Sequence, residues 1–182
     1  MERISEEDVD CFLQQMKRLS EADSAIDMRQ EERRHFQDFC IWIPEVFRQT
    51  EIENAEEIFW SERLPDVVFL NEDKTAGITL QKFEDARTRV SMTGIRQMLE
   101  KLDDRLVFYD TGMETDGIKV HWLEYKSFAA DVRVYNVLFI FCAGSKEILG
   151  TFFCRFEEYE QWKPVIWEMM RTIKEEYKHE RT

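Results

Sequence analysis

The sequence predicts an α+β fold: an α/β/α sandwich with a central antiparallel sheet of about six or seven strands and helices on both faces. Two observations carry this prediction. Three runs rich in Val, Ile, Phe, Tyr and Trp follow one another between Lys119 and Phe156, with short breaks at 129–131 and 144–145. Such runs are typical of strands joined by hairpins. The middle run, 132–143, is apolar on both faces, which indicates a strand at the centre of a covered sheet.

Two amphipathic helices are expected to cover the sheet. The first runs from Ser91, its N-cap, to Asp103, and the second from Glu157 to Tyr177. Their apolar stripes are Met92, Ile95, Met98, Leu99 and Leu102 in the first helix and Tyr159, Trp162, Ile166, Met169, Ile173 and Tyr177 in the second. Pro164 leaves two alternatives for the second helix. Either the helix kinks there, or residues 157–162 form a separate turn and Pro164 is the first helical residue.

Shorter β-rich runs supply the remaining strands. They are 39–43, 66–70, 75–83 and 106–109. The polar residues 71–74 are expected to form a turn, and residues 112–117 a loop. A short helix is expected at 54–58, capped by Thr50.

The chain divides into an N-terminal helix with a charged linker, 1–35, and a single domain, 36–182. The helix is expected from Ser5 to Leu19, with a narrow apolar stripe that includes Phe12 and Met16. This stripe either docks on its own domain or pairs with a second copy. The prediction is therefore a monomer or a weak homodimer.

Composition limits the function. The chain has 182 residues, of which 43% are hydrophobic and 13% aromatic, and its net charge is −13. This composition indicates a globular protein. The acidic charge argues against binding to nucleic acids or to anionic membranes. Two interpretations of the negative charge remain: it keeps the protein soluble, or it attracts a basic partner. No apolar run approaches the ~20 residues of a membrane span, and the polar N-terminus is unlike a signal peptide, so we expect a cytoplasmic protein.

Motifs for catalysis, metal binding and cofactor binding are absent from the sequence, and we therefore predict no enzyme activity, no metal and no cofactor. His121 could act as a base for Cys142 or Cys154, although a half-buried strand histidine is the commoner arrangement. A turn at 144–145 places Cys142 opposite Glu147 and Cys154 opposite Tyr135, so the two cysteines would not form a disulfide. We expect both to be small buried residues.

One group of residues is a candidate partner-binding site. If the turn is centred on Ala130, then Tyr125 and Tyr135 are cross-strand neighbours, with Arg133 and Ser127 beside them. Aromatic pairs next to a cation often line recognition surfaces. The alternative is ordinary cross-strand packing under a helix.

The sequence resembles the PsbP-like superfamily from about Phe36 to Glu176. The motifs that carry the resemblance are I-x-I-P-x-x-F at 41–47, Y-K-S-F at 125–128, V-Y-N-x-x-F at 134–139, G-T-F-x-C at 150–154 and W-K-P at 162–164. The superfamily includes the extrinsic photosystem II subunit, a Ran-binding nuclear-transport factor and small bacterial proteins. The resemblance implies an α/β/α sandwich around an antiparallel sheet and a function in binding other proteins. It carries over no site residues.

The sequence therefore predicts a bacterial, non-enzymatic protein-binding or adaptor module whose protein partner is unknown. The alternative is a small-ligand-binding protein or a hydrolase that uses a carboxylate-lined pocket.

Overall fold

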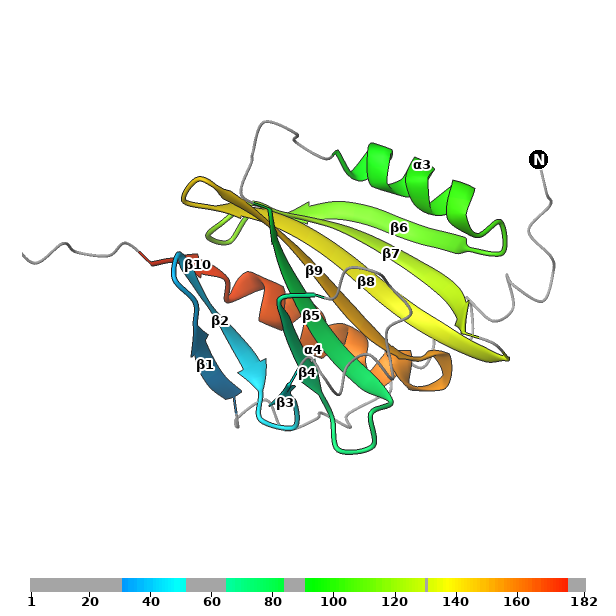
Figure 1. Ribbon diagram of the computed structural model, residues 1–182, viewed down its shortest axis with the longest axis horizontal. Coiled ribbons are helices and arrows are strands. Elements are labelled where there is room, and N and C mark those ends of the chain that lie inside the picture. The colour runs from blue at the N-terminus through cyan, green and yellow to red at the C-terminus, as the bar shows by residue number, and fades with distance from the viewer. Residues whose placement is uncertain (1–30, 52–64, 84–90, 130, 177–182) are drawn as a thin grey trace, which may run out of the picture.

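The computed structural model describes residues 31–51, 65–83, 91–129 and 131–176. Its elements are β1 (Glu31–His35), β2 (Phe39–Pro44), β3 (Arg48–Thr50), β4 (Val67–Leu70), β5 (Ala76–Phe83), α3 (Met92–Leu102), β6 (Val107–Glu114), β7 (Val120–Ala129), β8 (Val132–Ala143), β9 (Lys146–Arg155), the 3-10 turn η1 (Phe156–Glu158), α4 (Tyr159–Arg171) and β10 (Lys174–Glu175). The strands form a seven-stranded sheet, β3-β4-β5-β9-β8-β7-β6, and a three-stranded sheet, β1-β2-β10 (Figure 1). The predicted antiparallel architecture is confirmed.

The meander β7-β8-β9 supplies three adjacent strands of the seven-stranded sheet. Its second turn has the predicted register, with Cys142 opposite Glu147 and Tyr135 opposite Cys154. Its first turn does not. Lys126, rather than Tyr125, lies opposite Tyr135. The expected register is wrong by one residue, and a shift of one residue moves a side chain to the other face of a sheet.

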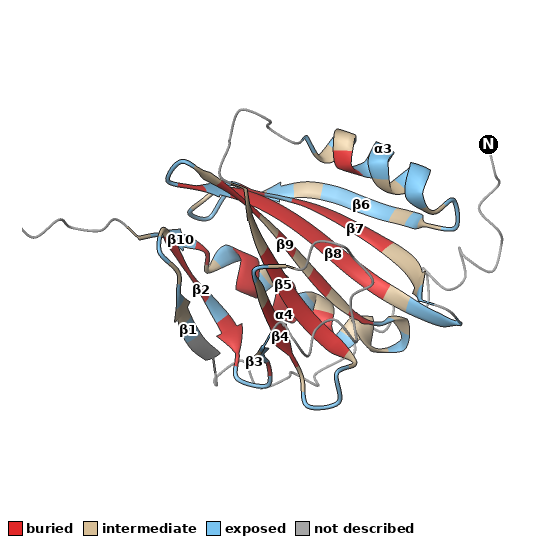
Figure 2. Ribbon diagram, viewed as in Figure 1, coloured by how far each residue is buried: buried red, intermediate tan, exposed pale blue. Residues whose placement is uncertain are grey.

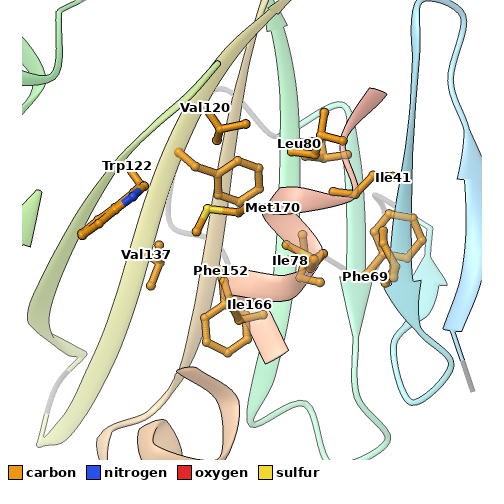
Figure 3. Packing of buried hydrophobic residues seen from close by; sticks show 14 of the residues in the cluster. Ile41, Phe69, Ile78, Leu80, Val120, Trp122, Val137, Phe152, Ile166 and Met170 are labelled. Carbon is orange, nitrogen blue, oxygen red and sulfur yellow. The ribbon is translucent and has the colours of Figure 1, made fainter. Parts of the chain in front are cut away.

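One face of the large sheet carries the main core. Helix α4 and strand β2 pack there against β5, β7, β8 and β9. Figure 3 shows Ile41 of β2 and Ile166 and Met170 of α4 close to side chains of the large sheet. Trp162 of α4 is 7% exposed, and its ring centroid lies 4.9 Å from that of Phe47. This tryptophan is therefore part of the contact between the helix and the sheet.

A smaller apolar cluster covers part of the opposite face. Ile95 of α3 is buried there against Leu123 and Tyr125 of β7 and against Leu138 and Ile140 of β8. These strand residues alternate with residues of the main core, so α3 and α4 lie on opposite faces of the sheet. Figure 2 shows how little of α3 is buried compared with the central strands.

The predicted stripe of α3 is only partly buried. Ser91 caps the helix as expected, since its Oγ accepts a hydrogen bond from the backbone N–H of Gly94 at 3.1 Å. However, Met98 is 54% and Leu102 is 74% exposed. The helix contacts the sheet along a narrower line than its apolar residues suggest.

Three segments differ from the predictions. Residues 31–35, expected as linker, form β1, because they pair along their whole length with β2. Residues 112–114, expected as loop, continue β6. The last helix ends at Arg171 rather than Tyr177, because residues 174–175 pair with β2 as β10. Pro164 lies inside α4, so the alternative that made it the first helical residue is wrong.

Two other predicted elements, the N-terminal helix at 5–19 and the short helix at 54–58, lie outside the described residues. Thr50, the proposed cap of the second, belongs to β3. Within the part of the chain that the structure describes, no helix is long and apolar enough to cross a membrane.

Candidate functional site

The structure separates the three residues that we predicted to form a partner-binding site. Tyr125 lies in the α3 cluster and is 8% exposed, whereas Tyr135 lies in the main core and is 1% exposed. Burial raises the pKa of Tyr125 to about 12. Burial also raises the pKa of Tyr135, and the nearby carboxylate of Glu124 raises it further. Only Arg133 remains at the surface. The expected pairing of the tyrosines is wrong, because the first turn of the meander is shifted by one residue.

A different set of side chains surrounds Arg133, and we call it the cation–aromatic patch. Its members are Arg105, Tyr109, Lys126, Phe128, Arg133 and Phe156. The guanidinium of Arg133 lies 5.3 Å from the ring centroid of Phe156, and that of Arg105 lies 5.5 Å from the ring centroid of Phe128. The ammonium of Lys126 lies 5.4 Å from the Phe156 ring centroid and 5.6 Å from that of Phe128. Each cation is close enough to a ring for a cation–π interaction.

Several elements bring this patch together at the end of the β7-β8 hairpin. Lys126 and Phe128 lie two residues apart on β7 and share the face of α4, and Phe128 lies opposite Arg133 of β8. Phe156 follows directly after β9, and its ring centroid lies 6.4 Å from that of Tyr109 on β6. Sequence reasoning found Arg133 but missed the residues around it, because they come from four separate segments.

The charges of the patch are unequally compensated. Arg133 pairs with Glu157 at 2.7 Å, and Arg105 pairs with Asp103 at 2.8 Å. The pKa of Glu157 lies below its usual value because its own backbone N–H and Arg133 donate hydrogen bonds to the carboxylate. Within the described ranges, Lys126 has no ion-pair partner. It is therefore the cation of the patch that is open to an acid from outside.

Next to the patch, the interface between α4 and β7 contains a buried ion pair. Glu124 is 4% exposed. Its carboxylate accepts two hydrogen bonds from Lys163 Nζ, at 2.8 and 3.0 Å, and one from the hydroxyl of Tyr135 at 2.9 Å. A β-bulge faces it, since Tyr109 and Asp110 of β6 both lie opposite this residue. Bulges are frequent beside functional sites.

The ion pair belongs to a row of contacts along one side of α4. Residues at i, i+4, i+8 and i+12 of the helix meet residues of the sheet one after another. These contacts are Tyr159 with Tyr135, Lys163 with Glu124, Trp167 with Trp122, and Arg171 with Glu114. The spacing of four helical residues, about 6 Å, matches that of two strand residues, about 6.7 Å. The row holds α4 in one position along β7.

The cysteines and His121 do not form a catalytic arrangement in the structure. His121 is exposed and makes no hydrogen bond with Cys142 or Cys154. Cys154 is fully buried, and burial raises the pKa of its thiol. Cys142 is exposed, so our expectation that it is buried is wrong. It lies near the end of β8, beyond the residues that α3 covers.

A polar cleft with a volume of about 600 Å³ opens on the face that α3 covers only in part. Its walls come from β5, β7, β8 and β9 and from the turn before β5. Apolar groups such as Val132, Val134 and Phe153 form much of the lining, and hydroxyl and amide side chains are set among them: Thr75, Thr79, Gln81, Ser127, Asn136 and Thr151. Asp73 is the one carboxylate among the described residues that line the cleft. Among the described residues, no group of three or more His, Cys, Asp or Glu side chains is placed to hold a metal ion.

Comparisons with known proteins agree with the geometry of the sheet. No protein-family model and no curated protein matches the sequence. The architecture is that of the PsbP-like fold. The chain superposes on the solution structure of cyanobacterial PsbP (CyanoP) from Synechocystis sp. PCC 6803 with a TM-score of 0.60 and 12% identity, over 85% of this chain and 98% of that one. The predicted resemblance is thus confirmed for the fold.

Two other solved structures are similar over 79% of this chain. One is from Bacteroides thetaiotaomicron VPI-5482, with a TM-score of 0.47 and 16% identity over 47% of that chain. The other is a Pseudomonas aeruginosa protein of unknown function, with a TM-score of 0.45 and 8% identity over 95% of that chain.

Proposed function

We propose that this protein is a protein-binding module and that the cation–aromatic patch is the centre of its interface. The observation that carries the proposal is the position of Lys126. Its ammonium lies between the rings of Phe128 and Phe156 and has no ion-pair partner in the described part of the chain. In a chain with a net charge of −13, an uncompensated cation on an aromatic surface favours an acidic group from a partner.

The surroundings of Lys126 have the composition of an interface centre. Aromatic residues and Arg are enriched at protein–protein interfaces, and they supply most of the binding energy at hot spots. The patch contains three aromatic rings and two arginines, and the exposed side chain of Val107, 40% accessible, extends its apolar area. The rings also restrict the long cationic side chains, which lowers the entropy lost on binding.

These features define the chemistry of the partner. It should present acidic side chains next to apolar or aromatic ones, so that the acids reach Lys126 and the apolar groups cover Phe128 and Phe156. The resemblance to the PsbP-like proteins supports the same class of function, because it implies binding to other proteins. The resemblance does not identify the partner.

The test is a comparison of two doubly substituted variants in native lysate. Lys126→Glu with Arg133→Glu reverses the charge of the patch. Lys101→Glu with Lys119→Glu makes the same change in net charge at exposed positions outside the patch. We expect the wild-type protein and the control to recover the same stoichiometric partner, and the patch variant to recover at least about tenfold less of it. Equal recovery by all three proteins, or no stoichiometric partner for the wild type, would contradict the proposal.

A further inference from the structure

We propose that the polar cleft is a binding site for a small hydroxylated molecule that carries one anionic group, such as a sugar carboxylate or a sugar phosphate. The cleft lies on the α3 face of the sheet, opposite the ion pair of Glu124 and Lys163. Its volume of about 600 Å³ falls within the ~300–1,000 Å³ that is usual for small-molecule sites. Paired strands form its floor, so the site is largely preformed.

The floor of the cleft offers hydrogen-bonding groups that the protein itself does not use. Thr79 and Thr151 are cross-strand neighbours on β5 and β9, and Gln81 lies two residues further along β5. Within the described residues, none of these three side chains makes a hydrogen bond. On the other face of the same strands, the adjacent residues Ile78 and Phe152 are fully buried. Polar groups at the middle of a sheet need water or a ligand to satisfy them.

Asn136 and Phe153 complete the floor. Asn136 is 6% exposed, and its Nδ2 donates hydrogen bonds to Ser127 Oγ at 2.8 Å and to the backbone carbonyl of Val134 at 3.1 Å. Both amide hydrogens are thereby used, and the carbonyl oxygen remains as an acceptor for a ligand hydroxyl. The Phe153 ring lies against the backbone of β5 at Gly77, where an added Cβ would lie 2.6 Å from the ring. This ring gives the cleft an apolar wall for the C–H groups of a sugar.

One end of the cleft is positively charged. Lys74 and Arg155 both line it, and the backbone N–H of Arg155 donates to the carbonyl oxygen of Thr75, the neighbour of Lys74, at 3.2 Å. Neither cation forms an ion pair within the part of the chain that the structure describes. Asp73 lines the same region and can accept a hydrogen bond from a hydroxyl. Two cations without an ion pair at one end and neutral polar groups along the floor fit a hydroxylated ligand with one anionic group.

This site is independent of the proposed protein interface. Ser127 and Val134 line the cleft, whereas their chain neighbours Lys126 and Arg133 belong to the patch. Adjacent residues of a strand point to opposite faces. A substitution in one site therefore leaves the other unchanged, and either proposal can fail while the other stands.

The test is an NMR titration of the full-length, ¹⁵N-labelled protein with glucuronate, glucose 6-phosphate and glucose. We expect saturable shifts at the amides of Thr79, Thr151 and Asn136 with at least one of the two anions, and about tenfold weaker binding of glucose. Tighter binding of glucuronate would assign a carboxylate as the anionic group, and tighter binding of glucose 6-phosphate a phosphate.

Variants of the cleft sharpen the test. Arg155→Gln removes a cation from an exposed position and should weaken binding of the preferred anion about tenfold. Thr151→Val keeps the shape of the side chain and should weaken it about fivefold. Arg133→Gln, in the patch, is the control and should bind like the wild type. If Thr151→Val fails to fold, the wild-type titration and Arg155→Gln still decide the question.

Three results would overturn the proposal. The first is no shift at the cleft amides with about 20 mM of either anion, a concentration that would reveal even millimolar affinity. The second is binding of glucose as tight as that of the anions. The third is unchanged binding by Arg155→Gln.

Discussion

The two faces of the large sheet are built from the same strands but differ in almost every physical respect. The face under α4 is closed, apolar and rich in aromatic contacts, and its main charge, on Glu124, is paired. The other face carries the small cluster under α3, a second small cluster of Val68, Leu70 and Phe153, and the threonines and amides of the cleft. Because side chains alternate along a strand, each strand contributes to both faces at once. The face under α4 holds the fold together, and the other face carries the cleft for which we propose a ligand.

The buried interface under α4 and the protein surface also differ in whether their charged side chains are paired. In the closed interface, Lys163 Nζ is held by both oxygens of Glu124, and the pair positions α4. The exposed Lys74 and Arg155 and the partly buried Lys126 have no ion-pair partner among the described residues. A buried charge needs a partner because its desolvation is costly, whereas an exposed cation keeps its hydration. These cations without ion-pair partners are therefore the positions at which we propose that anionic groups bind.

The largest expected effect is the loss of packing on the closed face. Trp162→Ala should lower the free energy of unfolding by ~3–5 kcal/mol, since it removes a large side chain from the aromatic contacts with Phe47 and Phe152. Ile95→Ala on the α3 face should cost less, ~2 kcal/mol, because its cluster is smaller and neighbours solvent-exposed helix residues. Urea unfolding measures both. A loss below ~1 kcal/mol for Trp162→Ala would show that α4 is not anchored there.

A smaller effect is expected from the ion pair. Lys163→Met leaves the carboxylate of Glu124 buried beside a single hydroxyl donor, and should destabilise the protein by ~3 kcal/mol. This value is at the lower end for such changes because the Lys163 side chain is 35% exposed. Adding Glu124→Gln removes the unpaired charge and keeps an acceptor for the Tyr135 hydroxyl, so the double variant should recover most of the loss. Additive losses in this double-mutant cycle would show that the two side chains are not coupled.

The contrast between the two turns of the meander explains how much of the fold could be predicted. Gly144, with a φ of +59°, is a clear turn residue, and the register after it was predicted correctly down to single pairs. The connection between Ala129 and Val132 contains no glycine, and the register across it was wrong by one position. Because of this shift, Tyr125 and Tyr135 lie on opposite faces of the sheet, and the predicted group of Tyr125, Arg133 and Tyr135 does not form. Strand β1 and the end of α4 were missed because their pairing with β2 is a long-range effect that overrides local pattern.

The candidate sites were less predictable, because they too depend on contacts between segments that are far apart in the sequence. Glu124 and Lys163 are 39 positions apart, and the W-K-P motif that contains Lys163 does not indicate a charged partner. Thr79 and Thr151 look like ordinary strand residues until β5 and β9 pair. Arg133 was found from its place in the β7-β8 hairpin, but its contacts with Phe156 and Glu157, which lie outside that hairpin, were not. Residues that act together across strands leave no local signal in a single sequence.

The smallest effect concerns pH and the tyrosine of the α3 face. Burial raises the pKa of Tyr125 to about 12, from an ordinary value of 10.0. The unfolded chain therefore loses this proton at lower pH than the folded protein, so the contribution is present below pH ~10 and is lost as the pH rises toward ~12. Tyr125→Phe removes the contribution, and its stability should fall less steeply over this range.

At pH ~11, about one unit above the unfolded pKa, the difference should amount to about 1.4 kcal/mol, since one unit of pKa corresponds to that free energy. The measurement is the free energy of unfolding in urea for both proteins between pH ~8 and pH ~12. Below pH ~9 the two curves should run parallel, because the phenol is protonated in both states, and this range is the internal control. Curves that stay parallel up to pH ~12 would show that the hydroxyl of Tyr125 reaches water, and that the α3 face is open there as well as at the cleft.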